Sequence, residues 1–421
     1  MKRTLKLSKW IFAVLTICML ALHASTAATA ANYSDNYAIT NLRQVGSFDD
    51  GFTIMWDNKG FYRFDVWFST TQNGTYKKLN SERTNSTFWA VTDLQPGKSY
   101  YIKIQGYDYD GLCTKTTKPL EVATYPDPDI TVKQTAGTTK KIAFSWTPSS
   151  GATGYLVSKY SITVNGKKET KKLLGTKAVA GTKLTVSAEP GQKYYIQVVP
   201  FRTSSSKFRA MCRYEINYSS LTIFAAPGKA TNLAKSIYYD SDSMSFKWDY
   251  CKTDVRSSGY TWKIEIYSLK GKKLGTVSSK DPECNVKSKK IRDEITKYGF
   301  KFRVRASFVY ENCLLNGEWS DVKTVIPAAK MPKYFRYVSG TSYKFTWGKV
   351  PGATCYYIYV NRNNGQGKWT YKKVSNKQTS FVLNNIKKGQ KIKVCVLPVV
   401  KVNGKDVKGL MNSGYTTTYY K

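Results

Sequence analysis

Residues able to carry out acid–base or metal chemistry are few in this sequence. The single histidine, His23, lies within the first 30 residues, which we expect to be removed as a signal peptide. Without it the chain lacks the usual general base near neutral pH and the commonest ligand for transition metals. The acidic residues are scattered, and no pair recurs at positions typical of a glycosidase. We therefore expect no catalytic, cofactor-binding or metal-binding residue, and a protein that is not an enzyme.

The cysteines give no better support for a reactive site. The chain has eight, and removing Cys18 with the signal peptide leaves seven, an odd number that cannot pair completely within one chain. No two lie at the Cys-x-x-Cys spacing of a zinc or thiol-redox site. We expect most of them to fill small buried or half-buried spaces. The seven are Cys113, Cys212, Cys251, Cys284, Cys313, Cys355 and Cys395.

Aromatic side chains are the remaining candidates for ligand contact. Exposed rings can stack on sugars, and tryptophan and tyrosine are favoured at interfaces. The alternative is that each ring packs across neighbouring strands of a small domain. The candidate ligand-contacting residues are Trp67, Trp89, Trp262, Trp319 and Trp369.

The charge is strongly positive. There are 66 Lys and Arg against 28 Asp and Glu, and removing four cations with the signal peptide leaves 62 against 28, or +34. Such a surface attracts polyanions, among them anionic cell-wall polymers and, through charge alone, nucleic acid. The alternative is that the lysines only keep strand-rich surfaces soluble and protect sheet edges. They are spread along the chain, in short pairs such as Lys167-Lys168 and without a long block.

The first 30 residues have the pattern of a signal peptide for secretion. Four cations precede an apolar run from Ile11 to Leu22, and small residues follow up to Ala28-Thr29-Ala30. The apolar run is shorter than the roughly twenty residues that a spanning helix needs. We therefore expect cleavage after Ala30, a secreted or cell-surface location and no transmembrane segment.

A repeat of about a hundred residues organises the rest of the chain. Short apolar strands end in tryptophan four times, at spacings of 90, 102 and 99 residues. Each is followed by a Tyr-rich strand, then by a glycine turn that introduces a further apolar strand. No stretch shows a sustained helical period, and Asp293 to Lys297 is expected to form one turn at most. The four tryptophans are Trp56, Trp146, Trp248 and Trp347.

The combined pattern resembles the fibronectin type III family. The first repeat carries Leu-x-Pro-Gly-x-x-Tyr in full, from Leu94 to Tyr100. The second keeps Pro190-Gly191 and the tyrosine, whereas Phe302 and Ile392 replace that tyrosine in the third and fourth. The resemblance implies an all-β chain of tandem immunoglobulin-like β-sandwiches. The expected domains are 31–126, 127–226, 227–327 and 328–421, after the signal peptide 1–30.

We expect a secreted, non-enzymatic protein of binding or adhesion, since one domain type runs throughout and the surface is cationic. Its partners would be an extracellular protein or polysaccharide, or an anionic cell-wall polymer. One alternative is a set of spacer repeats with no ligand of their own. Another is an accessory module of polysaccharide degradation, which no separate catalytic stretch supports. Resemblance to exported repeat proteins suggests a Gram-positive bacterial source.

Overall fold

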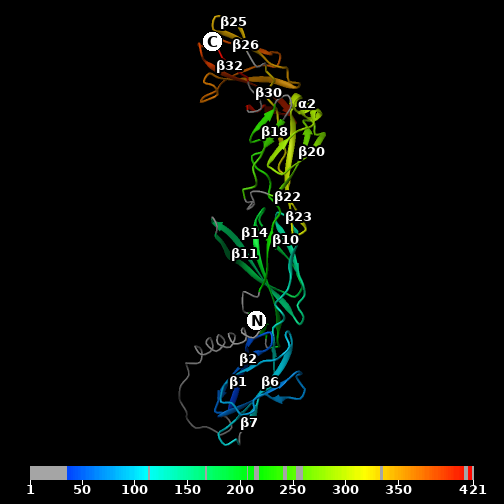
Figure 1. The fold of residues 1–421 in the computed structure, drawn as a ribbon, viewed down its shortest axis with the longest axis vertical. Coiled ribbons are helices and arrows are strands. Elements are labelled where there is room, and N and C mark those ends of the chain that lie inside the picture. The colour runs from blue at the N-terminus through cyan, green and yellow to red at the C-terminus, as the bar shows by residue number, and fades with distance from the viewer. Residues whose placement is uncertain are drawn as a thin grey trace, which may run out of the picture. The chain divides into compact units, whose positions relative to one another are not determined.

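In the computed structural model of the 421-residue chain, β-strands are the predominant element among the described residues (Figure 1). The structure describes residues 36–111, 114–165, 168–205, 207–212, 218–239, 244–252, 259–331, 335–411 and 416–419. The expected signal peptide and Cys113 lie outside these residues. Among the described residues, the strands form eight antiparallel sheets, alternately of three and of five strands.

The first pair of sheets shows the plan that the later pairs repeat. The three-stranded sheet has the order β1-β2-β5, formed by Ala38–Ser47, Phe52–Lys59 and Phe88–Val91. The five-stranded sheet has the order β4-β3-β6-β7, with β8 also paired to β6. Its strands are Lys77–Lys78, Arg63–Ser69, Ser99–Tyr107, Thr114–Thr116 and Leu120–Ala123. Side chains alternate along each strand, so that one face of each sheet is buried between the two layers.

The second, third and fourth pairs have the same strand order. In the second, β9, β10 and β13 are Val132–Gly137, Lys141–Trp146 and Lys183–Ser187; β11, β12, β14, β15 and β16 are Gly154–Asn165, Lys168–Val179, Lys193–Thr203, Arg209–Met211 and Ser219–Phe224. In the third, β17, β18 and β21 are Ile237–Tyr239, Met244–Lys247 and Glu283–Asn285; β19, β20, β22, β23 and β24 are Thr261–Ser268, Lys273–Ser279, Phe300–Tyr310, Cys313–Asn316 and Lys323–Val325. In the fourth, β25, β26 and β29 are Arg336–Ser339, Ser342–Thr346 and Ser380–Leu383; β27, β28, β30, β31 and β32 are Ala353–Asn361, Thr370–Ser375, Lys391–Val402, Lys405–Lys408 and Thr416–Tyr419.

The fold class predicted from the sequence is confirmed, because strands 1, 2 and 5 of each repeat form one sheet and strands 3, 4, 6, 7 and 8 form the other. That is the strand arrangement of an immunoglobulin-like sandwich whose last strand is divided in two, since strands 7 and 8 pair with different parts of strand 6. We call the four pairs of sheets the first to fourth sandwich. Contacts divide the chain into two compact units, residues 1–126 with 202–211 and residues 127–201 with 212–421. The exact domain boundaries remain predictions.

The repeated tryptophan is the centre of each core. All four are buried, and each packs edge-on against an aromatic ring of the next strand, with ring centroids 5.3–5.6 Å apart and interplanar angles of 65–71°. Edge-to-face contact is a favourable arrangement for aromatic quadrupoles. The pairs are Trp56–Phe64, Trp146–Tyr155, Trp248–Trp262 and Trp347–Tyr356.

The corner before the sixth strand differs among repeats as the sequence predicts. The Tyr100 hydroxyl accepts a hydrogen bond from the Gln95 amide at 3.0 Å, and the Tyr194 hydroxyl accepts one from the Glu189 amide at 2.9 Å. Phe302 and Ile392, which lack the hydroxyl, are fully buried at the same place. The apolar position is therefore filled in all four sandwiches.

One helix was missed. Residues Lys289–Tyr298 form α2, ten residues long, where the sequence analysis expected one turn. The Ser288 side chain accepts a hydrogen bond from the Ile291 amide and caps the helix, and Ile295 is buried. Two isoleucines four residues apart were too short a pattern to predict a helix.

Candidate functional site

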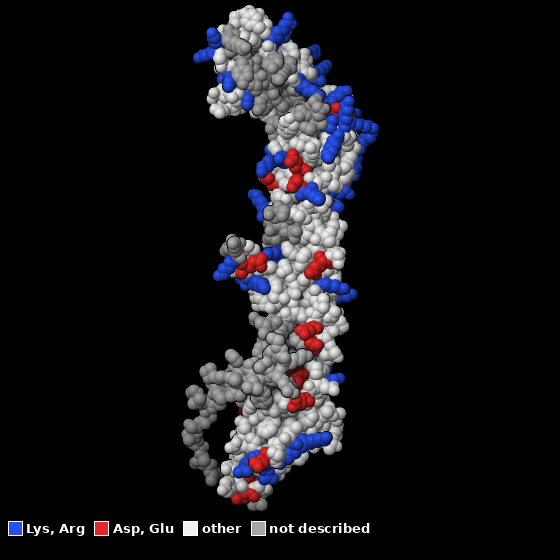
Figure 2. Space-filling view, viewed as in Figure 1, with Lys and Arg blue, Asp and Glu red and all other residues white. Residues whose placement is uncertain are grey.

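Acidic residues, more than lysines, are unevenly distributed among the sandwiches. Residues 31–126 contain 10 Lys and Arg and 10 Asp and Glu, so the first sandwich has no net charge. Residues 328–421 contain 18 Lys and Arg and a single acid, Asp406, which gives +17 out of the +38 of the whole chain. Figure 2 shows blue side chains over the fourth sandwich and over the region of α2 and β20. The fourth sandwich is therefore the strongest candidate for an anion-binding surface.

Three tyrosines form a cluster on the outer face of the five-stranded sheet of the fourth sandwich. Tyr357 and Tyr359 alternate with buried residues along β27, and Tyr371 lies opposite Tyr359 on β28. The Tyr371 ring centroid is 5.7 Å from that of Tyr357 and 5.4 Å from that of Tyr359, with tilts of 48° and 35°. The side chain of Tyr371 is 64% exposed. Tyr357 and Tyr359 are half-buried, so Tyr371 is the most exposed ring of the cluster.

Two lysines flank this cluster. The Lys408 ammonium on β31 lies 4.5 Å from the Tyr357 ring centroid and 5.3 Å from that of Tyr359, and it donates a hydrogen bond of 2.8 Å to the Tyr359 hydroxyl. The Lys373 ammonium lies 6.0 Å from the Tyr357 ring centroid. Among the described residues, neither lysine forms an ion pair with a carboxylate. We call Tyr357, Tyr359, Tyr371, Lys373 and Lys408 the Tyr–Lys face.

The corresponding face of the third sandwich has a buried carboxylate that pairs with two of its cations. Glu265 on β19 accepts hydrogen bonds from Lys273 at 2.8 Å, from Tyr267 at 2.6 Å and from two nitrogens of Arg303 at 2.8 and 2.6 Å. Burial by itself would raise the pKa of Glu265, but these hydrogen bonds and the Arg303 charge lower it to about 2. The Arg303 guanidinium also lies 4.4 Å from the ring centroid of Trp319. These cations are therefore part of the fold.

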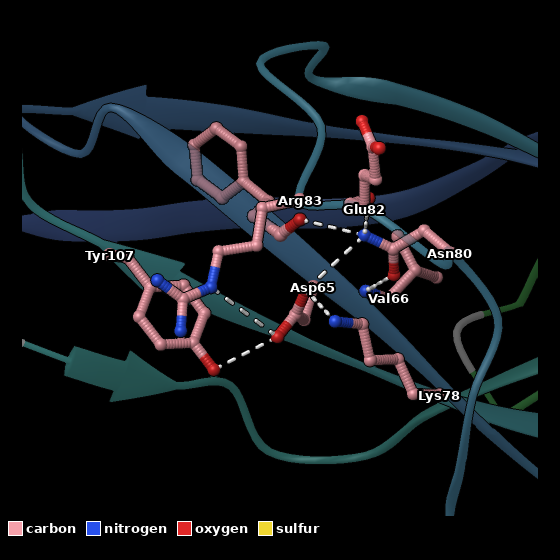
Figure 3. Close-up of polar contacts among 8 residues, drawn as sticks. Asp65, Val66, Lys78, Asn80, Glu82, Arg83 and Tyr107 are labelled. Carbon is pink, nitrogen blue, oxygen red and sulfur yellow. Dashed lines mark hydrogen bonds and ion pairs between the residues drawn. The ribbon is translucent and has the colours of Figure 1, made fainter. Parts of the chain in front are cut away.

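The outer face of the first sandwich has a similar arrangement around Asp65 on β3 (Figure 3). Its carboxylate accepts a hydrogen bond from the Tyr107 hydroxyl at 2.9 Å and lies 3.0 Å from the Lys78 ammonium. The Arg83 guanidinium is 3.9 Å from the same carboxylate and 3.5 Å from the Tyr107 ring centroid. Burial, together with the hydrogen bond to Asp65, raises the pKa of Tyr107. The Asn80 amide completes the network, with a bond of 3.3 Å to Asp65.

The five tryptophan candidates lie in different places and do not form one site. Trp262 is fully buried against Trp248, so its proposal as a ligand contact is corrected: it is a core residue, which its position in an alternating strand did not reveal. Trp67 is half-buried beside Lys78 and Lys103 on neighbouring strands, and Trp89 packs against the edge of the first core. Whether either binds a ligand stays a prediction.

The last two tryptophans lie in the second unit. Trp319 is half-buried on the outer face of the third sandwich, where Arg303 and Arg305 cover its ring at 4.4 and 4.8 Å. Trp369 is half-buried immediately before β28, two residues before Tyr371. Sequence reasoning missed the Tyr–Lys face because it weighed tryptophans alone. The scarcity of acids after residue 327 was the signal that could have found it.

Within the described residues, no group of three or more His, Cys, Asp or Glu side chains could hold a metal ion. The same part of the chain contains no helix that is long and apolar enough to cross a membrane.

No protein-family model matches this chain, and no curated protein matches it. Among solved structures, it is similar to the crystal structure of the FN1-FN3 domains of chicken CNTN1, at 12% identity. The match covers 69% of this chain and 97% of that one, with a TM-score of 0.23. The fold class of this chain therefore rests on its own strand order and core.

Proposed function

We propose that this chain is a secreted, non-enzymatic binding protein whose fourth sandwich binds an anionic polysaccharide through the Tyr–Lys face. The observation that carries the proposal is the absence of any carboxylate paired with Lys373 or Lys408 among the described residues. In the first and third sandwiches, by contrast, lysines on the strands that correspond to β28 are paired with buried acids, Lys78 with Asp65 and Lys273 with Glu265. Lysines next to hydroxyl groups can bind an anion and hydrogen-bond to its neighbours.

The arrangement of the rings favours a polyhydroxylated anion over nucleic acid. Stacking of bases on aromatic side chains requires open ring faces. Here the three rings pack against one another, and Lys408 covers part of Tyr357 and Tyr359. The half-buried Tyr357 and Tyr359 therefore offer little ring face to a base, whereas the exposed Tyr371 and the two ammonium groups can contact an acidic sugar.

The test is binding of the full mature chain to immobilised polygalacturonate, with neutral dextran and single-stranded DNA as comparison ligands. We expect the double variant Lys373→Ala/Lys408→Ala to bind polygalacturonate about tenfold more weakly, since two charge contacts together contribute about 1–2 kcal/mol. Raising the salt concentration should weaken binding of the native chain but leave part of it, because hydrogen bonds are not screened.

The matched control is Lys344→Ala/Lys387→Ala, which removes the same charge from exposed positions of the same sandwich outside the Tyr–Lys face. An equal loss in both double variants would mean that net charge alone attracts the polymer. Tighter binding to DNA than to polygalacturonate, or no binding to either, would contradict the proposal.

A spacer role is the second candidate, and the contact between the second and third sandwiches favours it. The Tyr310 hydroxyl donates a hydrogen bond of 2.6 Å to the Thr222 carbonyl, and its ring centroid is 4.6 Å from that of Phe224. A packed junction of this kind would fix the spacing between neighbouring sandwiches. If the chain bound no polyanion, the spacer role would become the leading proposal.

A further inference from the structure

Strand β31 lies at the edge of the five-stranded sheet of the fourth sandwich, next to the third sandwich. On one side of the strand, Lys408 contacts Tyr357 and Tyr359 as part of the Tyr–Lys face. The neighbouring residue Val407 points to the opposite side, as alternation requires. There it packs against a cluster that joins the two sandwiches, formed by Ile326, Val400 and Val402 with Leu269 and Val407 at its margin.

The contact brings a lysine-bearing turn of the third sandwich to this edge. Leu269 belongs to the turn between β19 and β20, which the Ser268 amide closes with a hydrogen bond of 2.8 Å to the Lys272 carbonyl. Gly271 has a φ of +92°, which an L-residue adopts only with strain. The turn therefore holds Lys270 and Lys272 exposed on either side of this glycine.

The lysines of this edge are available for a ligand. Among the described residues, no ion pair involves Lys270, Lys272 or Lys405, whereas the neighbouring Lys273 is bound to Glu265. Asp406 is the only acid in the fourth sandwich. A further hydrogen bond, from the Leu410 amide to the Ile326 carbonyl at 2.9 Å, ties the two sandwiches at the same place. The lysine-bearing turn of the third sandwich and the edge strand β31 of the fourth thus meet at one apolar cluster.

We infer that the anion-binding surface crosses this junction, from the Tyr–Lys face over β31 to Lys270 and Lys272, and that its ligand is a linear polymer bound by both sandwiches at once. This inference rests on the proposed function. Three strand spacings of ~4.8 Å separate β28 from β31, so the face alone is about 14 Å wide. A polymer that continues onto the turn binds a second set of cations without a second loss of translational freedom.

The experiment compares short and long galacturonate oligomers, of about two and about twelve sugars, binding to the full mature chain. For Lys270→Ala/Lys272→Ala we expect about five- to tenfold weaker binding of the long oligomer and unchanged binding of the short one. The control is Lys263→Ala/Lys280→Ala, which removes the same charge from the other end of the β19–β20 hairpin. It should leave both affinities unchanged.

The outcomes separate this inference from the proposed function. If Lys373→Ala/Lys408→Ala weakens binding of both oligomers but Lys270→Ala/Lys272→Ala affects neither, the binding face stands and the extension across the junction is wrong. Equal losses for the control and for the turn variant would also overturn the extension. If the native chain binds neither oligomer, both the proposed function and this inference fail.

Discussion

The first and fourth sandwiches have the same strand order and the same edge-on tryptophan, but they differ in the balance and pairing of their charged residues. In the first, equal numbers of acids and bases occur, and the buried Asp65 holds Lys78 and Tyr107. In the fourth, 18 cations accompany one acid, and Lys373 and Lys408 lie over tyrosines. The core therefore does not determine the outer face. A lysine is structural or available according to whether a carboxylate lies beside it.

The third sandwich shows that total charge is a poor guide to this distinction. It has an excess of cations, yet Glu265 binds Arg303 and Lys273 on the face that corresponds to the Tyr–Lys face. Lys270 and Lys272, for which no ion pair is formed among the described residues, lie at the turn beside the fourth sandwich. The comparison must be made face by face and not domain by domain.

The largest expected effect on stability tests the tryptophan-centred core that the first and fourth sandwiches share. Trp56→Ala and Trp347→Ala should each destabilise their own sandwich by about 3–5 kcal/mol, because each removes a buried indole and leaves a cavity. Hydrogen exchange of the full chain, read separately for β2 and β26, measures both losses. If one of the two variants did not destabilise its sandwich, the two cores would not be equivalent, and the claim that the sandwiches differ only on their outer faces would be wrong.

The next effect tests whether Asp65 is structural. Asp65→Asn keeps the shape but removes the charge that Lys78 and Arg83 face, and we expect a loss of about 2–3 kcal/mol in the first sandwich. Faster hydrogen exchange in β3 and β6 is the measurement. The control is Asp57→Asn, whose ion pair with Arg43 is exposed and should contribute less than about 1 kcal/mol. Equal effects would show that burial of Asp65 adds nothing.

A third effect, about 1–2 kcal/mol, follows from Glu265. Its pKa in the folded protein is about 2, below the ordinary 4.5, so the stabilisation is complete above about pH 4.5 and is lost as the pH falls toward 2. The full shift would correspond to about 3 kcal/mol, which the half-exposed partners reduce by screening. Hydrogen exchange of β19 between pH 5 and pH 2.5, corrected for its intrinsic rate, should show this loss. Glu265→Gln should already be destabilised at pH 7 and should not change further, and a parallel pH response in both proteins would contradict the assignment.

Much of the fold could be predicted from the sequence because its determinants are local and repeated. Tryptophan at the end of one strand, alternation in the next and glycine at the corner each depend on nearby residues. The helix α2 could not be predicted, since its stability comes from Ile295 packing into a core built by distant strands. Trp262 was misjudged for the same reason, because alternation shows that a strand has two faces but not which face is inside.

The candidate site was less predictable, because it depends on pairs of residues far apart in sequence. Lys408 lies 49 residues from the Tyr359 hydroxyl that it contacts, and Glu265 lies 38 residues from Arg303. The sequence shows how many cations exist but not which of them form an ion pair with a carboxylate. Only strand pairing across the sheet decides that question.

The smallest effect separates binding from stability on the fourth sandwich itself. Tyr371 lies on the edge strand β28 with 64% of its side chain exposed, so Tyr371→Ala should lower stability by only about 1 kcal/mol, the scale of its ring contacts, and leave the sandwich folded. Binding of polygalacturonate should nevertheless weaken about fivefold, or about 1 kcal/mol, because a ring edge and a hydroxyl are lost from the Tyr–Lys face. The matched control is Tyr337→Ala, a tyrosine 57% exposed on β25 of the opposite sheet. Because both variants remove one exposed ring from the same cationic sandwich, only the position of the ring differs. A loss confined to Tyr371→Ala would place the ligand on the Tyr–Lys face, whereas equal losses would mean that any exposed tyrosine on this sandwich contributes.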